Sequence, residues 1–431
     1  MKIIQAFMLL SILVILISCS ADENNGPAPL ITISEPLENS SYSFLDTVFV
    51  KAFISHDKSI SYIKVSILNN DATPVFPVQL FYPETNEYYL KTALIFDNLL
   101  TESGHYTIQV KAESGGEVTN EWARINYTSA PKVLESAVVV TKGAGNSFHV
   151  FDVGDDNLVL ERFSFSGDYA GSAISSRNQL FFTMGSVFND LSAWELSTKK
   201  LRWSVPAVVN PPIPYFTGIY SDDNEVFVST REAFIYGYDE TGLNTFRSEK
   251  FTNGIFTSFI RHKNWLTAIF KPYNSPLKEL VVLNYPGGTV FQSLQFDGEV
   301  AAIADYGNLG LLVFINKDSD AVVYHYQFDS NTLVKLKEFP QGIIYSLYMS
   351  DFQNAYIAFA DGVYWYRPET GSAVKIIPVQ DVSDIAYDSV SEMLFVSHFN
   401  KLDVYRMPSA QLVETSTFTD DILDIHLHYN K

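Results

Sequence analysis

Hydrophobic and polar positions alternate in short runs along the first part of the chain. Between residues 30 and 127 there are seven such runs, each five to nine residues long and bounded by turn-forming residues. Alternation with a period of two is typical of strands that bury one face, and no run keeps the spacing of an amphipathic helix. The pattern predicts an all-β sandwich over residues 30–129, with strands at 30–34, 47–54, 60–68, 75–82, 88–96, 105–112 and 122–127.

The run from residue 104 to residue 112 carries the most specific pattern of this first domain. Tyr106, Ile108, Val110 and Ala112 fall on one face of it. The segment resembles the penultimate strand of bacterial immunoglobulin-like and fibronectin-type domains, which implies an immunoglobulin-like β-sandwich with a tyrosine that closes a corner. The cysteine pair of antibody domains is missing. We expect this domain to act as a spacer, and a direct binding role stays open.

A second, longer period governs residues 130–431. An apolar anchor follows a turn every 38 to 45 residues. An apolar strand, an aromatic-rich strand that ends in a turn, and a fourth strand then lead to the next anchor. Four strands in each repeat of this length are typical of a β-propeller blade. The seven anchors are Ile174, Ile219, Phe259, Ile303, Leu347, Ile385 and Ile425.

The seventh repeat is split between the two ends of this domain. The last anchor strand, 422–429, is followed by too few residues for three more strands, whereas residues 136–165 supply three strands without an anchor strand. We expect the two segments to form one blade, because ring closure removes unpaired strand edges. The sequence therefore predicts a seven-bladed β-propeller over residues 130–431. An irregular array of β-sandwiches is the alternative, since a β-helix needs shorter repeats.

The turn after the aromatic-rich strand carries a second resemblance. Residues 238–242 read Tyr-Asp-Glu-Thr-Gly, and Thr370-Gly371 keeps the last two of these positions. This domain resembles the quinoprotein and YVTN-type propeller superfamily, which has an Asp-x-x-Thr-Gly turn. The corresponding turns at 284–288 and 406–410 have diverged. The resemblance therefore implies the fold, while the divergence of these turns argues against retained cofactor chemistry of one branch, and we expect no cofactor.

The amino terminus reads as a targeting segment. Lys2 precedes an almost wholly apolar run from residue 3 to residue 17, which is short for a bilayer-spanning helix. The sequence Leu-Ile-Ser-Cys at 16–19 resembles the bacterial lipobox, which implies cleavage before Cys19 and acylation of that residue. We expect a lipoprotein signal peptide at 1–18 and an acidic flexible tether at 19–29. A generic secretory signal and an uncleaved anchor helix are the alternatives.

The lipobox resemblance also implies a location. It places the protein in the outer membrane of a Gram-negative cell, with the lipid at Cys19 as its contact with the membrane. The acidic residues after Cys19 resemble the tether of some lipoproteins exported to the cell surface. We therefore expect a surface-exposed protein, although short acidic linkers also occur as plain spacers.

Composition and charge exclude several classes of protein. Apolar residues make up 47% of the 431 residues, which excludes a disordered chain. The formal net charge of −20 argues against a nucleic-acid partner, which needs a basic surface. The chain has one cysteine, Cys19, so it has no intrachain disulfide and no multi-cysteine zinc site.

Few residues suggest metal or catalytic chemistry. His426 and His428 share one side of the last strand and, with Asp424, could offer three metal ligands. We expect no metal, because polar residues are expected on that side of the strand. Acidic clusters such as 155–157 and 222–225 are interpreted as solvated turns rather than calcium loops. No serine nucleophile elbow or Walker loop is present, while a glycosidase-type carboxylate pair stays open.

Geometry suggests where a ligand would bind. In a four-stranded blade, the loops that enter the inner strand and those that join the second and third strands share one face around the channel mouth. Aromatic residues beside amides and charges in these loops suit a carbohydrate or a peptide. The candidate ligand-binding residues are Tyr215, Arg231, Lys271, Tyr273, Asp361 and His398.

These observations predict a lipid-anchored binding or scaffold protein of the cell envelope. The sandwich would space a propeller that binds a protein or a glycan. The alternative is a propeller enzyme at the cell surface, either a glycan hydrolase or lyase or a quinoprotein-like enzyme. A purely structural component of a surface complex is a third reading. The sequence identifies no catalytic residue.

Overall fold

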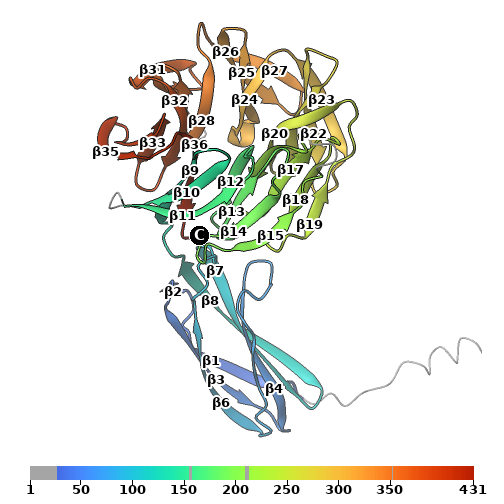
Figure 1. Ribbon diagram of the computed structural model, residues 1–431. Coiled ribbons are helices and arrows are strands. Elements are labelled where there is room, and N and C mark those ends of the chain that lie inside the picture. The colour runs from blue at the N-terminus through green and yellow to red at the C-terminus, as the bar shows by residue number, and fades with distance from the viewer. Residues whose placement is uncertain (1–26, 155–157, 209–212, 352) are drawn as a thin grey trace, which may run out of the picture. The chain divides into compact units, whose positions relative to one another are not determined.

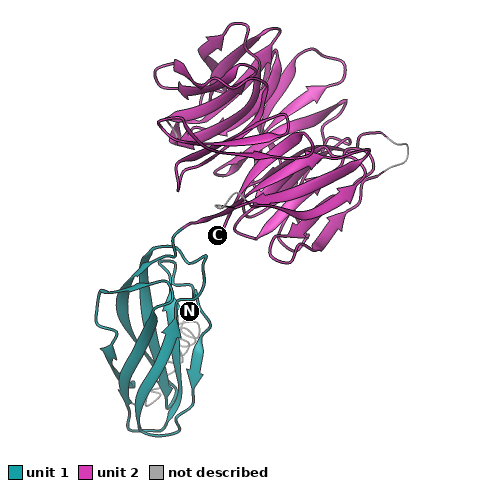
Figure 2. Cartoon of the chain, turned by 60° about the vertical axis from the view of Figure 1, so that its left-hand side comes forward, with its two compact units in different colours: residues 1–131 teal, residues 132–431 magenta. Residues whose placement is uncertain are grey.

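The structure is a computed structural model that describes residues 27–154, 158–208, 213–351 and 353–431. The expected signal peptide, Cys19 and most of the expected tether lie outside the described residues. The chain forms two compact units, residues 1–131 and 132–431, coloured separately in Figure 2. Within the described ranges, no helix has both the length and the hydropathy needed to cross a bilayer.

Unit 1 consists of two β-sheets around one hydrophobic core. All strand pairs are antiparallel except β2 with β8, which is parallel. The first sheet has the order β1 (Leu30–Glu35), β3 (Thr47–Ser55), β6 (Glu87–Ile95). The second has the order β2 (Ser40–Ser43), β8 (Glu117–Thr128), β7 (Gly104–Ser114), β4 (Ile60–Leu68), β5 (Gln79–Phe81) (Figure 1).

The alternation of the sequence determines which side chains enter this core. In β3 the buried Val48 and Val50 alternate with the more exposed Phe49 and Lys51. Tyr106 of β7 is buried, and its hydroxyl donates a hydrogen bond of 2.8 Å to the backbone carbonyl of Glu102. This bond satisfies a polar group that would otherwise be buried without a partner, and it fixes the chain where β7 begins.

In the residues that the structure describes, unit 2 forms seven four-stranded antiparallel sheets. Six of them are formed by consecutive strands. These are β12–β15 (Gly171–Ser175, Leu180–Met184, Leu191–Glu195, Leu201–Val205), β16–β19 (Phe216–Ser221, Val226–Thr230, Ile235–Tyr238, Asn244–Arg247), β20–β23 (Gly254–His262, Trp265–Pro272, Lys278–Asn284, Val290–Phe296), β24–β27 (Glu299–Asp305, Leu311–Lys317, Asp320–Gln327, Thr332–Phe339), β28–β31 (Ile344–Asp351, Asn354–Phe359, Gly362–Arg367, Ser372–Ile377) and β32–β35 (Val382–Asp388, Met393–His398, Lys401–Arg406, Gln411–Thr417).

The seventh sheet joins the two ends of unit 2. Its order is β36 (Ile422–Tyr429), β9 (Leu134–Lys142), β10 (Ser147–Val153), β11 (Val159–Ser166). Ile425 of β36 lies opposite Val139 of β9 in the antiparallel register. The pairing of the last anchor strand with the segment that begins at residue 136 is confirmed.

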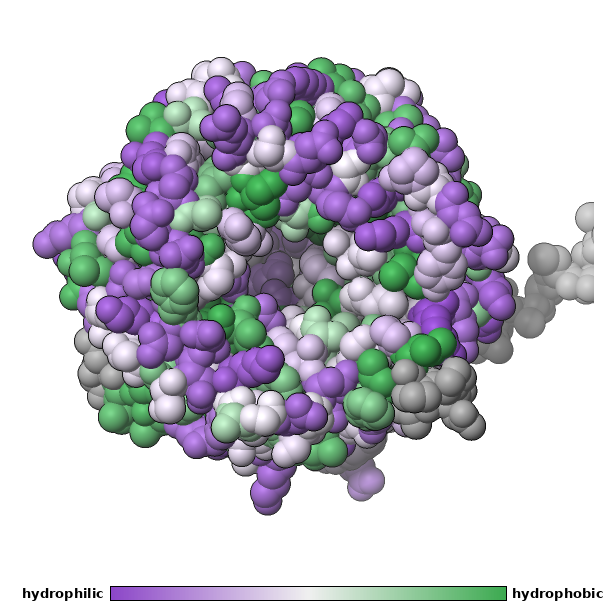
Figure 3. Space-filling view, turned by 45° about the horizontal axis from the view of Figure 1, so that its top comes forward, coloured by the Kyte–Doolittle hydropathy of each residue, from purple (hydrophilic) through white to green (hydrophobic). Residues whose placement is uncertain are grey.

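The first strands of neighbouring sheets contact one another in succession. These contacts run from β12 through β16, β20, β24, β28 and β32 to β36, and β36 in turn contacts β12. The space-filling view shows a hollow at the centre of this arrangement (Figure 3). The all-β fold class is confirmed, and the arrangement of sheets in unit 2 is propeller-like.

The second strand of each sheet contributes the largest share of the buried apolar side chains of unit 2. β13 and β17 are buried at every position, and β25 is buried from Leu311 to Ile315. Neighbouring sheets cover both faces of such a strand, so its sequence is continuously apolar instead of alternating. The hydrophobic clusters accordingly combine residues of adjacent sheets.

Candidate ligand-binding site

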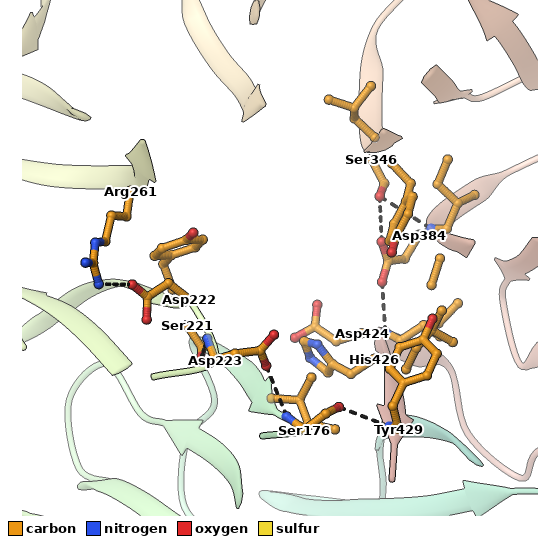
Figure 4. Close-up of a pocket in the computed structure, with 18 of the residues that line it drawn as sticks. Ser176, Ser221, Asp222, Asp223, Arg261, Ser346, Asp384, Asp424, His426 and Tyr429 are labelled. Atoms are coloured by element: carbon orange, nitrogen blue, oxygen red, sulfur yellow. Dashed lines mark hydrogen bonds and ion pairs between the residues drawn. The ribbon is translucent and has the colours of Figure 1, made fainter. Parts of the chain in front are cut away.

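A cavity of about 740 Å³ lies among the first strands of unit 2. Residues of β12, β16, β20, β28, β32 and β36, together with Lys132, line its wall. Figure 4 shows two polar groups on opposite sides, with Asp222 and Arg261 on one side and Asp384, Asp424 and His426 on the other. The charged lining residues are four carboxylates and two cations, namely Asp222, Asp223, Asp384, Asp424, Lys132 and Arg261.

Asp384 connects three neighbouring first strands. Its Oδ1 accepts hydrogen bonds from the Ser346 hydroxyl of β28 (2.6 Å) and from the backbone N–H of Ile385 (2.9 Å). Its Oδ2 accepts the backbone N–H of Ile425 on β36 (2.8 Å). A first strand has a hydrogen-bonded neighbour within its sheet on one side only, so this carboxylate satisfies a donor on the free edge of β36.

The surroundings of Asp384 favour its protonated form. Burial, and then the negative charge of Asp424, raise the pKa of Asp384 to about 7, although the hydrogen bonds from Ser346 and from two backbone N–H groups act in the opposite direction. A carboxyl with this pKa is accessible in both protonation states near neutral pH, so it can serve as a proton donor or acceptor within the cavity.

Asp424 belongs to a network that joins β36 to the sheet of β12. The Tyr169 hydroxyl and the Ser172 hydroxyl both donate to its Oδ2, the latter over 3.0 Å. Ser172 Oγ also lies 2.7 Å from His426 Nε2. Burial, together with the charge of Asp424, raises the pKa of Tyr169 far above its ordinary value, so this hydroxyl remains a hydrogen-bond donor. Burial lowers the pKa of His426 against the opposing effect of Asp424, which favours a neutral imidazole.

Asp222 and Arg261 form an ion pair on the opposite wall. Arg261 Nη1 lies 2.6 Å from Asp222 Oδ2, and the guanidinium lies 3.9 Å from the centre of the Tyr285 ring. Asp222 Oδ1 accepts the backbone N–H of Glu225 (2.9 Å), so the carboxylate also holds the turn that follows β16. Both charges are thus partnered, and Arg261 is held by stacking as well as by charge.

Asp223 and Lys132 complete the charged part of the wall. Asp223 Oδ1 accepts the backbone N–H of Ser176 (3.1 Å), and burial raises the pKa of this carboxyl above its ordinary value. Lys132 Nζ lies 3.9 Å from the centre of the Tyr429 ring. The Tyr429 hydroxyl donates to the buried Asp388 (3.0 Å), which fixes the ring that Lys132 contacts.

The thermal stability of unit 2 should fall as the pH rises from about 4 to about 7. In this window folded Asp384 holds a proton that the unfolded chain, with an ordinary pKa of 3.8, has lost. Each tenfold change in proton affinity corresponds to about 1.4 kcal/mol, so the full effect is at most about 4 kcal/mol. Asp424→Asn removes the neighbouring negative charge, so the loss of stability between about pH 4 and about pH 7 should be smaller in this variant.

Melting temperatures measured by circular dichroism between pH 4 and pH 8 test this expectation. Asp329→Asn is the matched control, since Asp329 is exposed in the turn between β26 and β27. An equal pH dependence in the wild type and in Asp424→Asn would show that the two carboxyls do not influence each other.

The six residues expected to bind a ligand lie at the other ends of the strands. They precede a first strand or follow a second strand, whereas the cavity is lined by the middle and the carboxyl-terminal part of the first strands. None of the six belongs to the described lining of the cavity. They are Tyr215 before β16, Arg231 after β17, Lys271 and Tyr273 at the end of β21 and just beyond it, Asp361 after β29, and His398 at the end of β33.

The structure brings only two of these six residues together. The backbone N–H of Arg231 donates to the carbonyl of Tyr215 (2.7 Å). Lys271 pairs with Glu299 (3.3 Å), and His398 lies 3.0 Å from Asp403. Asp361 pairs with Lys375 and lines a separate hollow of about 420 Å³. The side chain of Tyr273 is exposed.

A regularity in the sequence, separate from the motifs described above, points to the carboxylates of the cavity. The residue just before the anchor is small in five repeats and an aspartate in two. The position faces a neighbouring strand closely, because a Cβ at Gly218 would lie 2.7 Å from the carbonyl oxygen of Thr257. The seven residues are Ala173, Gly218, Ser258, Ala302, Ser346, Asp384 and Asp424.

No protein-family model and no curated protein matches the chain. Among solved structures, the chain is similar to the computationally designed Ika8 protein, with 14% identity, a TM-score of 0.49, and coverage of 68% of this chain and 88% of that one. A quinoprotein alcohol dehydrogenase-like protein from Bacteroides thetaiotaomicron has 12% identity, a TM-score of 0.44, and coverage of 92% and 99%. A chain of a mitotic checkpoint complex has 11% identity, a TM-score of 0.46, and coverage of 58% and 78%. At these values the similarity carries no information on function.

Proposed function

We propose that this chain is a lipid-anchored protein of the cell envelope that binds a protein or a glycan at the centre of a seven-bladed β-propeller. In this proposal residues 1–18 are a signal peptide, Cys19 carries the lipid, and residues 19–29 are the tether. Residues 30–129 form an immunoglobulin-like spacer. The lipobox resemblance at residues 16–19 is the basis for the anchor and for a place in the outer membrane, and the acidic residues after Cys19 are the basis for exposure at the cell surface.

The proposed domain types are supported by particular contacts. The hydrogen bond from Tyr106 to the carbonyl of Glu102 has the form of the tyrosine corner found in immunoglobulin-like sandwiches. The contact of β36 with β12 and the pairing of β36 with β9 support a propeller of seven blades.

The observation that carries the binding function is the central cavity. At about 740 Å³ it has the volume of a typical small-molecule site, and carboxylates, a guanidinium and tyrosines converge on it from five first strands and the turn after β16, together with Lys132. Groups held in place by partners within the fold lose little freedom when they bind a ligand. Such a cavity suits the polar end of a glycan chain or of a protein segment.

Two binding experiments with a soluble chain that begins at Asn24 test this function. The chain is screened on a glycan array and is used in pull-downs from solubilised membranes. Asp223→Asn is the informative variant, because Asp223 lies on the cavity wall. The backbone at this position is left-handed, with a φ of 71°, and asparagine tolerates that conformation as well as aspartate does. We expect it to weaken binding of the retained partner at least tenfold. Asp329→Asn should leave that binding unchanged, and equal loss in both variants would contradict a role for the cavity.

The neighbouring carboxyls of Asp384 and Asp424 favour a second candidate function, glycoside hydrolysis. A carboxyl with a pKa of about 7 can donate a proton to a leaving group, while an ionised neighbour stabilises the positive charge that develops on the sugar. Hydrolysis of chromogenic glycosides by the soluble chain would support this candidate if Asp384→Asn abolished it. Binding without turnover would leave the binding function alone.

A further inference from the structure

We propose that the central cavity recognises a protonated primary amine, which displaces the Lys132 ammonium group from the ring of Tyr429. The inference rests on the proposed function, since it names the chemical group that the cavity binds. The observations that carry it are the charges that face the cavity, the position of Lys132, and the aromatic rings beside it.

The charges on the cavity wall leave carboxylates in excess. Arg261 is taken up by its ion pair with Asp222 and by the Tyr285 ring. Lys132 is then the one remaining permanent cation of the described lining, facing three carboxyls. Asp424 Oδ1 accepts no hydrogen bond from the part of the chain that the structure describes, since Tyr169 and Ser172 both donate to Oδ2. A cationic ligand that takes the place of the Lys132 ammonium group would keep a positive charge beside these carboxyls.

Lys132 shows that an ammonium group fits this wall. Its Nζ lies 3.9 Å from the centre of the Tyr429 ring, within the range of a cation–π contact. Burial raises the pKa of Asp223, and the charge of Lys132 acts against that rise, so the ammonium group lies within electrostatic reach of this carboxyl. Lys132 is an exposed residue, so its long side chain can leave the ring and enter solvent without disturbing the core.

The cavity offers more than one aromatic surface to a cation. Tyr220 and Tyr348 line it together with Tyr429. Burial raises the pKa of each of these hydroxyls above its ordinary value, so the rings stay neutral and keep the negative face that attracts a cation. An ammonium group has three N–H donors, which matches a wall of carboxylate and hydroxyl oxygens.

Calorimetric titration of the soluble chain from Asn24 onward tests the inference. The probes are spermidine, a peptide with one lysine and an acetylated amino terminus, and a glucosamine oligomer, so the arms distinguish a free polyamine, a protein side chain and an amino sugar that share the ammonium group. The lysine peptide acetylated on Nε and the N-acetylated oligomer are the matched neutral probes. We expect at least one amine to bind, and its acetylated form to bind at least tenfold more weakly. Equal binding of the amine and the neutral form, or no binding of any amine, would overturn the inference.

Two variants test the role of the residues. Lys132→Ala should increase amine affinity several-fold, because it removes the internal competitor, whereas Lys401→Ala, a change at an exposed lysine outside the cavity lining, should not. Asp424→Asn should lower the affinity for the amine at least tenfold. The melting temperature of this variant is measured to confirm that it folds. Unchanged or lower affinity in Lys132→Ala would overturn the displacement. If a neutral glycan binds the wild type and Asp223→Asn abolishes that binding, the amine inference is wrong and the proposed function stands. If no ligand binds, both the inference and the proposed function are wrong.

Discussion

Ending the chain after Asp421 should abolish the cooperative folding of unit 2. The truncation removes β36, which places four apolar or aromatic side chains in the core, each less than 9% exposed: Ile422, Ile425, Leu427 and Tyr429. At about 1.5–3 kcal/mol for each buried side chain, the loss is roughly 6–12 kcal/mol, comparable with the whole stability of an ordinary domain. It also leaves β9 with an unpaired edge and Asp384 without the N–H of Ile425.

Thermal unfolding and limited proteolysis measure this effect. We expect the transition of unit 2 to disappear and its strands to become sensitive to protease. A peptide of residues 420–431 added in trans should restore part of the protection, which would separate loss of pairing from a general folding defect. Val413→Asp is the control, since Val413 is about half exposed on the outer strand β35. A truncated chain with an unchanged transition would refute the role assigned to β36.

Replacing Cys19 with serine should move the protein from the membrane fraction to the soluble fraction. Each buried CH₂ group of an acyl chain contributes about 0.8 kcal/mol, so two or more chains anchor a protein stably, whereas serine accepts neither the thioether lipid nor processing at the lipobox. The measurement is partitioning into detergent after cell fractionation, combined with labelling by a radioactive or clickable fatty acid.

Two controls make this result interpretable. Ser20→Ala changes the neighbouring residue and should keep both label and membrane partitioning. Protease shaving of intact cells, applied to the wild type, tests exposure at the cell surface separately from anchoring. Membrane partitioning of Cys19→Ser equal to that of the wild type would refute the lipid anchor.

The repeat made the architecture of unit 2 predictable, because a spacing of 38 to 45 residues leaves room for four strands and a turn after each. Strand ends were less certain. We expected a strand at 75–82, but β5 covers only Gln79–Phe81. Pro74 and Pro77 lack the N–H that a sheet ladder needs, so proline interrupts an otherwise apolar run. The short β2 was missed, because four residues are too few to show a period.

The candidate site was harder to predict, because the cavity forms from residues far apart in the sequence. Asp384 meets Ser346 and the N–H of Ile425 only after three repeats come together. His426 and His428 were grouped on one polar side of the strand, yet His426 meets Ser172, whereas His428 meets Gln179 and is buried. Periodicity indicates which residues face away from the core, but the partners of those residues depend on the neighbouring sheet.

The sheet built from both ends of unit 2 has a consequence for the order of synthesis. A nascent chain presents β9, β10 and β11 long before β36, so this sheet lacks its first strand until residues 422–429 have been made. At about 5–20 residues per second, the wait after β11 lasts roughly 13–53 seconds. The proposed lipoprotein would benefit from this delay during export, because a translocation channel accepts an unfolded polypeptide and the final sheet would then be completed on the far side.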